Sequence, residues 1–124
     1  MFEVSMVMSF SAAHNLRGYR GKCEALHGHN WKVEATLSSS RLDKLGMVVD
    51  FTAIKESLKK TLSSLDHAYL NDVAPFDRLN PTSENIAQFV YGRMKKEFHC
   101  PGLKISRVKV WETETSAATY FEKP

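Results

Sequence analysis

The sequence has 124 residues, of which 43% are hydrophobic, enough for one globular core but too few for two. Seventeen Lys and Arg against fourteen Asp and Glu give a net charge of +3, too small to indicate nucleic-acid binding but suited to an anionic small molecule. No segment is apolar over a membrane-spanning length and Glu3 interrupts the N-terminal run, so we expect no membrane partner and one cytoplasmic domain over residues 1–124.

The first predicted element is a strand over residues 2–14. Its apolar side chains fall on even positions from Phe2 to Ala12 and alternate mostly with polar ones, which is the pattern of a half-buried strand. His14 continues the even series, so its imidazole should leave on the apolar face. The following residues, 15–22, contain two glycines and the cations Arg17, Arg20 and Lys22, and we expect a basic loop that could hold a phosphate group.

The next stretch, CEALHGHN at residues 23–30, contains a thiol, a carboxylate and two imidazoles. Apolar residues at odd positions from Trp31 to Leu37 predict a second strand, and His27 and His29 project to one side if the strand begins at them. Together with His14 they could bind zinc and leave a fourth position open, as catalytic sites do. The alternative is that these histidines make ordinary turn and strand-end hydrogen bonds.

Cys23 and Glu24 lie just before this histidine pair. Cys23 could be a fourth ligand, which would make the site structural, or a catalytic thiol whose pKa is lowered by the metal. Glu24 is a second candidate acid or base, with a solvated surface carboxylate as the alternative. Cys23 and Cys100 could form at most one disulfide, which a chain of this size does not need, so we expect both to be reduced.

Two amphipathic helices are predicted in the middle of the chain. Asp50 is a suitable N-cap for the first, whose apolar residues recur at helical spacing from Ile54 to Leu65. Asn80 or Thr82 can cap the second, whose apolar face extends over residues 86–98. Each helix has one apolar stripe, as expected for a helix lying on a sheet.

Two further acidic positions attract attention. Asp66 and His67 could form an acid–base pair in which the carboxylate orients the imidazole, although adjacent side chains diverge and a helix-ending Asp beside an exposed His is the alternative. Glu112 ends a strand predicted from Ile105 onward and would need paired N–H donors if buried. A last strand over 119–121 completes an α+β fold with helices on an antiparallel sheet.

Six ordered motifs resemble the 6-pyruvoyl-tetrahydropterin synthase and 6-carboxy-tetrahydropterin synthase family, and they extend through nearly the whole chain. They are FSAAH (10–14), Cys23 with HGH (27–29), VDF (49–51), LDH (65–67) with LN (70–71), NPTSEN (80–85) and VWET (110–113). The resemblance implies a T-fold, in which an antiparallel sheet carries two helices on one face. It further implies that subunits join their sheets into a barrel, as a homo-oligomeric trimer or hexamer with active sites between subunits.

The resemblance also implies roles for particular residues. The expected zinc ligands are His14, His27 and His29. The groups expected to move protons are Cys23, Asp66 and His67. The groups expected to hold the pterin are Glu112, Thr82, Ser83 and Glu84.

The spacing from Cys23 to His27 resembles the bacterial 6-carboxy-tetrahydropterin synthases of queuosine synthesis. The predicted reaction is the zinc-dependent conversion of 7,8-dihydroneopterin triphosphate to 6-carboxy-5,6,7,8-tetrahydropterin. Glu24 leaves open a catalytic role in cleavage to 6-hydroxymethyl-7,8-dihydropterin for folate, alone or as a dual activity. Formation of 6-pyruvoyl-tetrahydropterin is another alternative, and a zinc-stabilised binding module with Cys23 as fourth ligand is the non-enzymatic one.

Overall fold

The computed structural model describes residues 1–20 and 25–123. Its elements, in chain order, are β1 (Phe2–His14), β2 (His27–Ser39), α1 (Phe51–Leu62), β3 (Ala68–Tyr69), the 3-10 turn η1 (Leu70–Asp72), α2 (Ser83–Glu97), β4 (Leu103–Trp111) and β5 (Ala117–Tyr120). Within these ranges no helix has the length and apolar character needed to span a membrane.

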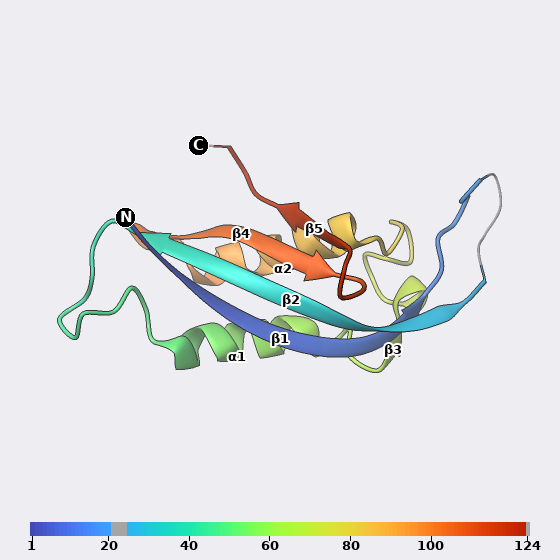
Figure 1. Cartoon of the computed structure of the whole chain (residues 1–124), viewed down its shortest axis with the longest axis horizontal. Coiled ribbons are helices and arrows are strands. Elements are labelled where there is room, and N and C mark those ends of the chain that lie inside the picture. Colours follow the sequence, from blue (N-terminus) through green and yellow to red (C-terminus); the bar gives the residue numbers. More distant parts are fainter. Residues whose placement is uncertain (21–24, 124) are drawn as a thin grey trace.

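The five strands form one sheet in the order β3-β1-β2-β4-β5. The neighbours among β1, β2, β4 and β5 are antiparallel, as predicted, and the α+β class is confirmed. The short strand β3, which the sequence did not predict, adds one parallel pair with β1 at Ala12 and Ala13. It runs parallel because β2 returns the chain to the level where β1 begins, and α1 and β3 then follow the direction of β1 (Figure 1).

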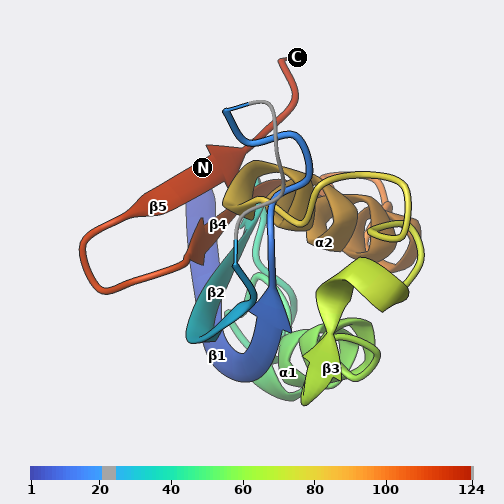
Figure 2. The ribbon, with the colours of Figure 1, turned by 90° about the vertical axis from the view of Figure 1, so that its right-hand side faces the viewer.

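Both helices cover the same face of the sheet (Figure 2). Asp50 caps α1 by accepting a hydrogen bond from the Thr52 amide at 2.9 Å, and the Thr82 hydroxyl caps α2 by accepting from the Asn85 amide at 3.1 Å. The first helix ends at Leu62 rather than near Leu65, and the Leu65 side chain is nevertheless fully buried.

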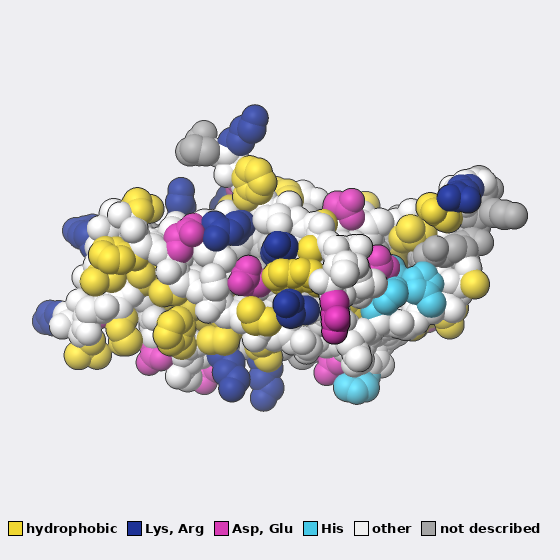
Figure 3. All heavy atoms as spheres, in the orientation of Figure 1, with side chains coloured by type: hydrophobic (Ala, Val, Ile, Leu, Met, Phe, Trp, Pro, Cys, Tyr) yellow, Lys and Arg dark blue, Asp and Glu magenta, His cyan; other side chains and the backbone are white. Residues whose placement is uncertain are grey.

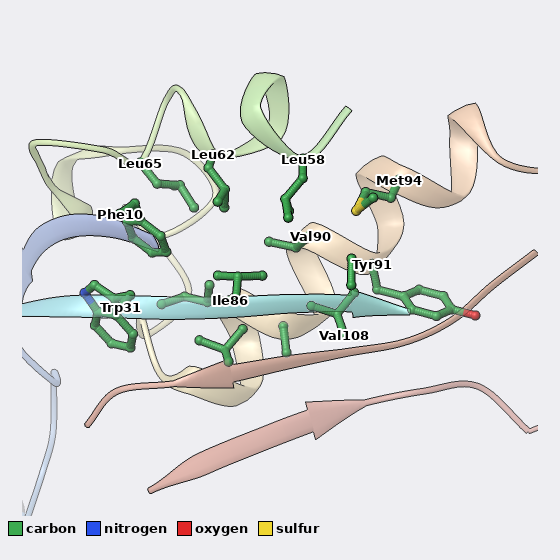
Figure 4. Close-up of a cluster of buried hydrophobic side chains, with 14 of the residues drawn as sticks. Phe10, Trp31, Leu58, Leu62, Leu65, Ile86, Val90, Tyr91, Met94 and Val108 are labelled. Atoms are coloured by element: carbon green, nitrogen blue, oxygen red, sulfur yellow. The ribbon is translucent and has the colours of Figure 1, made fainter. Parts of the chain in front are cut away.

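The core lies between the helices and the sheet (Figure 4). Leu58 of α1 and Val90 of α2 point toward each other and toward β2, and all of their surface is buried. Phe10 of β1 stacks on Trp31 of β2, with ring centroids 5.9 Å apart and planes within 6°. Apolar burial of this extent is the main stabilising contribution in a domain of this size.

The other face of the sheet carries no helix in the described part of the chain (Figure 2). Its side chains pair across the strands instead. Arg107 donates two hydrogen bonds to the Glu3 carboxylate at 2.8 and 3.1 Å, and this pairing holds the pKa of Glu3 below its ordinary value. Because β3 pairs with β1 only at Ala12 and Ala13, most of the outer edge of β1 has no strand beside it among the described residues.

We predict that Leu58→Ala lowers the free energy of unfolding by about 3 kcal/mol, because it leaves a cavity between two helices and a sheet. Leu45→Ala is the matched control, since Leu45 is 82% exposed and the same truncation there should cost less than about 0.5 kcal/mol. Urea unfolding of the two variants measures the difference. Equal losses would contradict the placement of the core.

Candidate functional site

Three histidines meet where β1 ends and β2 begins. Strand pairing sets His14 opposite His27 and Ala12 opposite His29, and alternate side chains share a face, as predicted. The ring centroid of His14 lies 4.5 Å from that of His27 and 5.2 Å from that of His29. Histidine side chains gather beside acidic ones near this end of the molecule (Figure 3).

Backbone carbonyls fix the tautomers of two of these rings. His14 Nδ1 lies 2.7 Å from the carbonyl oxygen of Pro81, and His27 Nδ1 lies 3.0 Å from that of Ala25. A carbonyl only accepts, so in each pair Nδ1 carries the hydrogen and donates it, and Nε2 is the nitrogen that can offer a lone pair to a metal ion. The edge contact with Trp31, with centroids 4.8 Å apart, holds the buried His14 ring from another side.

Glu112, which follows β4 directly, joins this group. Its Oε1 lies 2.9 Å from His14 Nε2, 3.1 Å from His29 Nε2 and 3.9 Å from His27 Nε2. The four candidate ligand atoms all lie within 4.8 Å of one another. Three imidazoles and a carboxylate are a donor set that suits zinc, so these residues fit a metal ion. The sequence did not indicate that Glu112 would reach the histidines, because β4 is far from them along the chain.

Asp66 and His67 are in contact, with Oδ1 and Nδ1 3.0 Å apart. A left-handed backbone at His67, with φ 58°, turns the two side chains toward each other and overcomes the divergence expected of neighbours. The Ser11 amide donates to Asp66 at 3.0 Å, and the His67 amide donates to the Ser11 carbonyl at 2.6 Å. The Ser11 hydrogen bond, followed by the charge of His67, holds the pKa of Asp66 below its ordinary value.

The Asp66–His67 pair approaches β1 on the side away from the histidine group. Its bonds go to the backbone of Ser11 at the outer edge of β1, which is the edge that faces β3 and not β2. His67 is strongly exposed and lines an open hollow of about 560 Å³ that crosses the sheet to His29 and Asn30. Within one chain, the two candidate groups therefore lie at the same end of the sheet, the histidine group where β1, β2 and Glu112 meet and the Asp66–His67 pair at the outer edge of β1.

The predicted pterin-holding segment begins α2. Thr82 uses its hydroxyl to cap the helix, Ser83 is half-buried in the first turn, and Glu84 is exposed beside it. The segment is linked to the histidine group through Pro81, whose carbonyl oxygen accepts a hydrogen bond from His14 Nδ1. Cys23, Glu24 and Lys22 lie outside the described residues.

Arg17, one of the three cations of the loop expected to attract a phosphate group, uses its guanidinium within the protein. Its guanidinium donates to the backbone carbonyls of Asn71, Phe76 and Leu79, at 3.0, 2.6 and 3.2 Å. These hydrogen bonds hold the loop between η1 and α2 against the end of β1. Charge pattern alone gave no signal of this, since a cation that binds carbonyls and one that faces solvent look the same in sequence.

Comparison with known proteins gives concordant matches. The family described as 6-pyruvoyl tetrahydropterin synthase matches residues 3–123. A Synechocystis protein named 6-carboxy-5,6,7,8-tetrahydropterin synthase is 40% identical over 126 residues, which cover 98% of this chain and 94% of that protein. A Haemophilus influenzae protein of the same name is 35% identical over 144 residues, covering 98% and 100%. The solved structure of Caenorhabditis elegans 6-pyruvoyl tetrahydropterin synthase has a TM-score of 0.83 at 27% identity, covering 98% and 96%.

We predict that His14→Ala weakens Zn²⁺ binding by more than about 100-fold, because loss of outer hydrogen-bond partners alone costs about 10- to 100-fold. Competition with a chromophoric chelator, starting from metal-free protein, measures the affinity. His99→Ala, at the far end of α2, is the control and should bind as the wild type does. Unchanged affinity in His14→Ala would exclude this residue as a ligand.

Proposed function

The chain belongs to the 6-pyruvoyl tetrahydropterin synthase family, and on that premise we propose that it is a zinc-dependent enzyme that converts 7,8-dihydroneopterin triphosphate to 6-carboxy-5,6,7,8-tetrahydropterin. The observation that carries the proposal is the convergence of His14, His27 and His29 with Glu112 in a chain whose relatives bear the name of this activity. A cytoplasmic location and a single T-fold domain over residues 1–124 stay predictions.

The three histidines are the proposed zinc ligands. His14 and His27 present Nε2 with its lone pair because carbonyls hold their Nδ1 hydrogens. When bound, zinc supplies Lewis acidity that makes the hydroxyls and carbonyl of the substrate side chain easier to deprotonate. We propose that the adjacent Glu112 carboxylate holds the pterin ring by accepting hydrogen bonds from paired N–H groups. The segment Thr82, Ser83 and Glu84 is proposed to help hold the ring.

Asp66 and His67 are proposed to transfer protons. An ionised Asp66 accepts the Nδ1 hydrogen of His67, and this leaves His67 Nε2 free to take or give a proton at the substrate. The lowered pKa of Asp66 favours the ionised form that this role needs. Cys23 is the proposed general base, and Glu24 is the residue on which a second product would depend.

A second copy of the chain is proposed to complete the site. Two features support it: the Asp66–His67 pair lies at the outer edge of β1, apart from the histidine group, and that edge has little pairing among the described residues. A neighbouring subunit that adds its strand there can bring its own groups to this end of the sheet. A trimer or hexamer is the assembly we expect.

Product analysis tests the function. Wild-type protein with Zn²⁺ and 7,8-dihydroneopterin triphosphate should yield 6-carboxy-5,6,7,8-tetrahydropterin by liquid chromatography and mass spectrometry. Cys23→Ala should slow product formation by about 100-fold or more, the usual contribution of a general base. Glu24→Ala should leave this product unchanged.

Other outcomes select the alternatives. A 6-hydroxymethyl product that disappears in Glu24→Ala would establish the cleavage activity, alone or beside the first. Absence of any product, together with unfolding on chelation of the metal, would instead support a zinc-stabilised binding module.

We predict that Glu112→Gln raises KM by about 10-fold or more, because Gln loses the charge that strengthens hydrogen bonds to pterin N–H groups. Its zinc content should stay at the wild-type level. Steady-state kinetics and metal analysis on the same preparation measure both. A fall in zinc affinity with an unchanged KM would make Glu112 a fourth ligand and not a pterin anchor.

A further inference from the structure

Arg17 ties a long loop to the end of β1. Its Nη2 donates to the carbonyls of Asn71 and Phe76, and its Nη1 donates to that of Leu79. A guanidinium has a rigid planar fork of donors, so three bonds from one side chain hold the loop between η1 and α2 in one conformation. Arg17 itself stands close to the proposed ligand His14 in sequence.

Two asparagine side chains reinforce this connection at the two ends of the loop. Asn80 accepts from the Arg17 amide at 2.9 Å and donates to the Arg17 carbonyl at 3.0 Å. Asn71 bonds the amide and the carbonyl of Asn15 in the same way, at 3.0 and 2.9 Å. The side-chain amide of each asparagine thus bonds the backbone N–H and C=O of a residue after β1, as a neighbouring strand would do.

The loop ends next to the Pro81 carbonyl, which orients the His14 ring. Pro81 follows Asn80 directly, and its carbonyl accepts the His14 Nδ1 hydrogen. The Asn80 carbonyl is itself fixed, because it accepts from the Thr82 amide and from the Asn85 side chain, both at 2.9 Å. The position of the Pro81 carbonyl therefore depends on contacts that Arg17 and Asn80 make.

We propose that Arg17 and Asn80 are positioning residues of the metal centre, which hold the Pro81 carbonyl against His14 and so fix the tautomer and direction of its ring. This inference rests on the proposed role of His14 as a ligand. His27 provides an internal comparison, since its Nδ1 donates to Ala25 in its own turn. Loss of the Arg17 contacts should therefore disturb His14 and leave His27 unchanged.

The first test is Zn²⁺ affinity of the full chain, measured by chelator competition on metal-free protein. Arg17→Gln should weaken binding by about 10-fold, the lower end of the range for outer-shell partners. Arg78→Gln is the matched control, because Arg78 belongs to the same loop but its side chain is 83% exposed. It should stay within about twofold of the wild type. Arg17→Lys keeps the charge without the planar fork, should show a smaller loss, and serves as the comparison if Arg17→Gln does not fold.

The second test follows the His14 ring by nitrogen NMR of metal-free protein. The wild type should show the tautomer protonated at Nδ1 for both His14 and His27, and Arg17→Gln should give a mixture of tautomers for His14 only. A lower melting temperature with unchanged zinc affinity and unchanged tautomers would overturn the inference and leave Arg17 a purely structural residue. A wild type that binds no zinc would instead overturn the proposed function, and the tautomer measurement would still report whether Arg17 holds His14.

Discussion

The register between β1 and β2 is the constraint on which the rest of the structure depends. The two strands pair without interruption from Phe2 opposite Ser39 to His14 opposite His27. A slip of one residue would turn every side chain to the other face of the sheet. The stacked pair Phe10 and Trp31 in the core opposes such a slip, and so the burial that stabilises the fold also sets which imidazoles meet.

Sequence reasoning succeeded where the cause is local. Two-residue alternation gave the extent of β1 and the shared face of the histidines, and capping chemistry gave the start of α1 at Asp50. It failed where the partner is distant in sequence. The carbonyls held by Arg17 lie in a loop that follows α1, the approach of Glu112 to the histidines depends on β4, and the pairing of β3 depends on the edge of β1. No local pattern records contacts of this kind.

The C-terminal end of β1 positions both candidate groups. Its side chain at His14 enters the histidine group on one face, while its backbone at Ser11 holds Asp66 and His67 at the edge. Backbone bonds of this kind position the pair without using a side chain of the strand. The left-handed conformation of His67 is tolerated here because two hydrogen bonds to the Ser11 backbone and the contact between Asp66 and His67 determine the turn.

The three histidines differ in burial, and this difference explains how His14 and His27 are held. The His14 side chain is 2% exposed, against 21% for His29 and 37% for His27. A buried N–H that lacks an acceptor costs about 1 to 3 kcal/mol, so His14 needs a carbonyl delivered to it from elsewhere in the protein. His27 lies near the surface, where a carbonyl from its own turn is sufficient. His14, the proposed ligand at the end of β1, therefore needs an acceptor from a distant part of the chain, and the loop held by Arg17 supplies it.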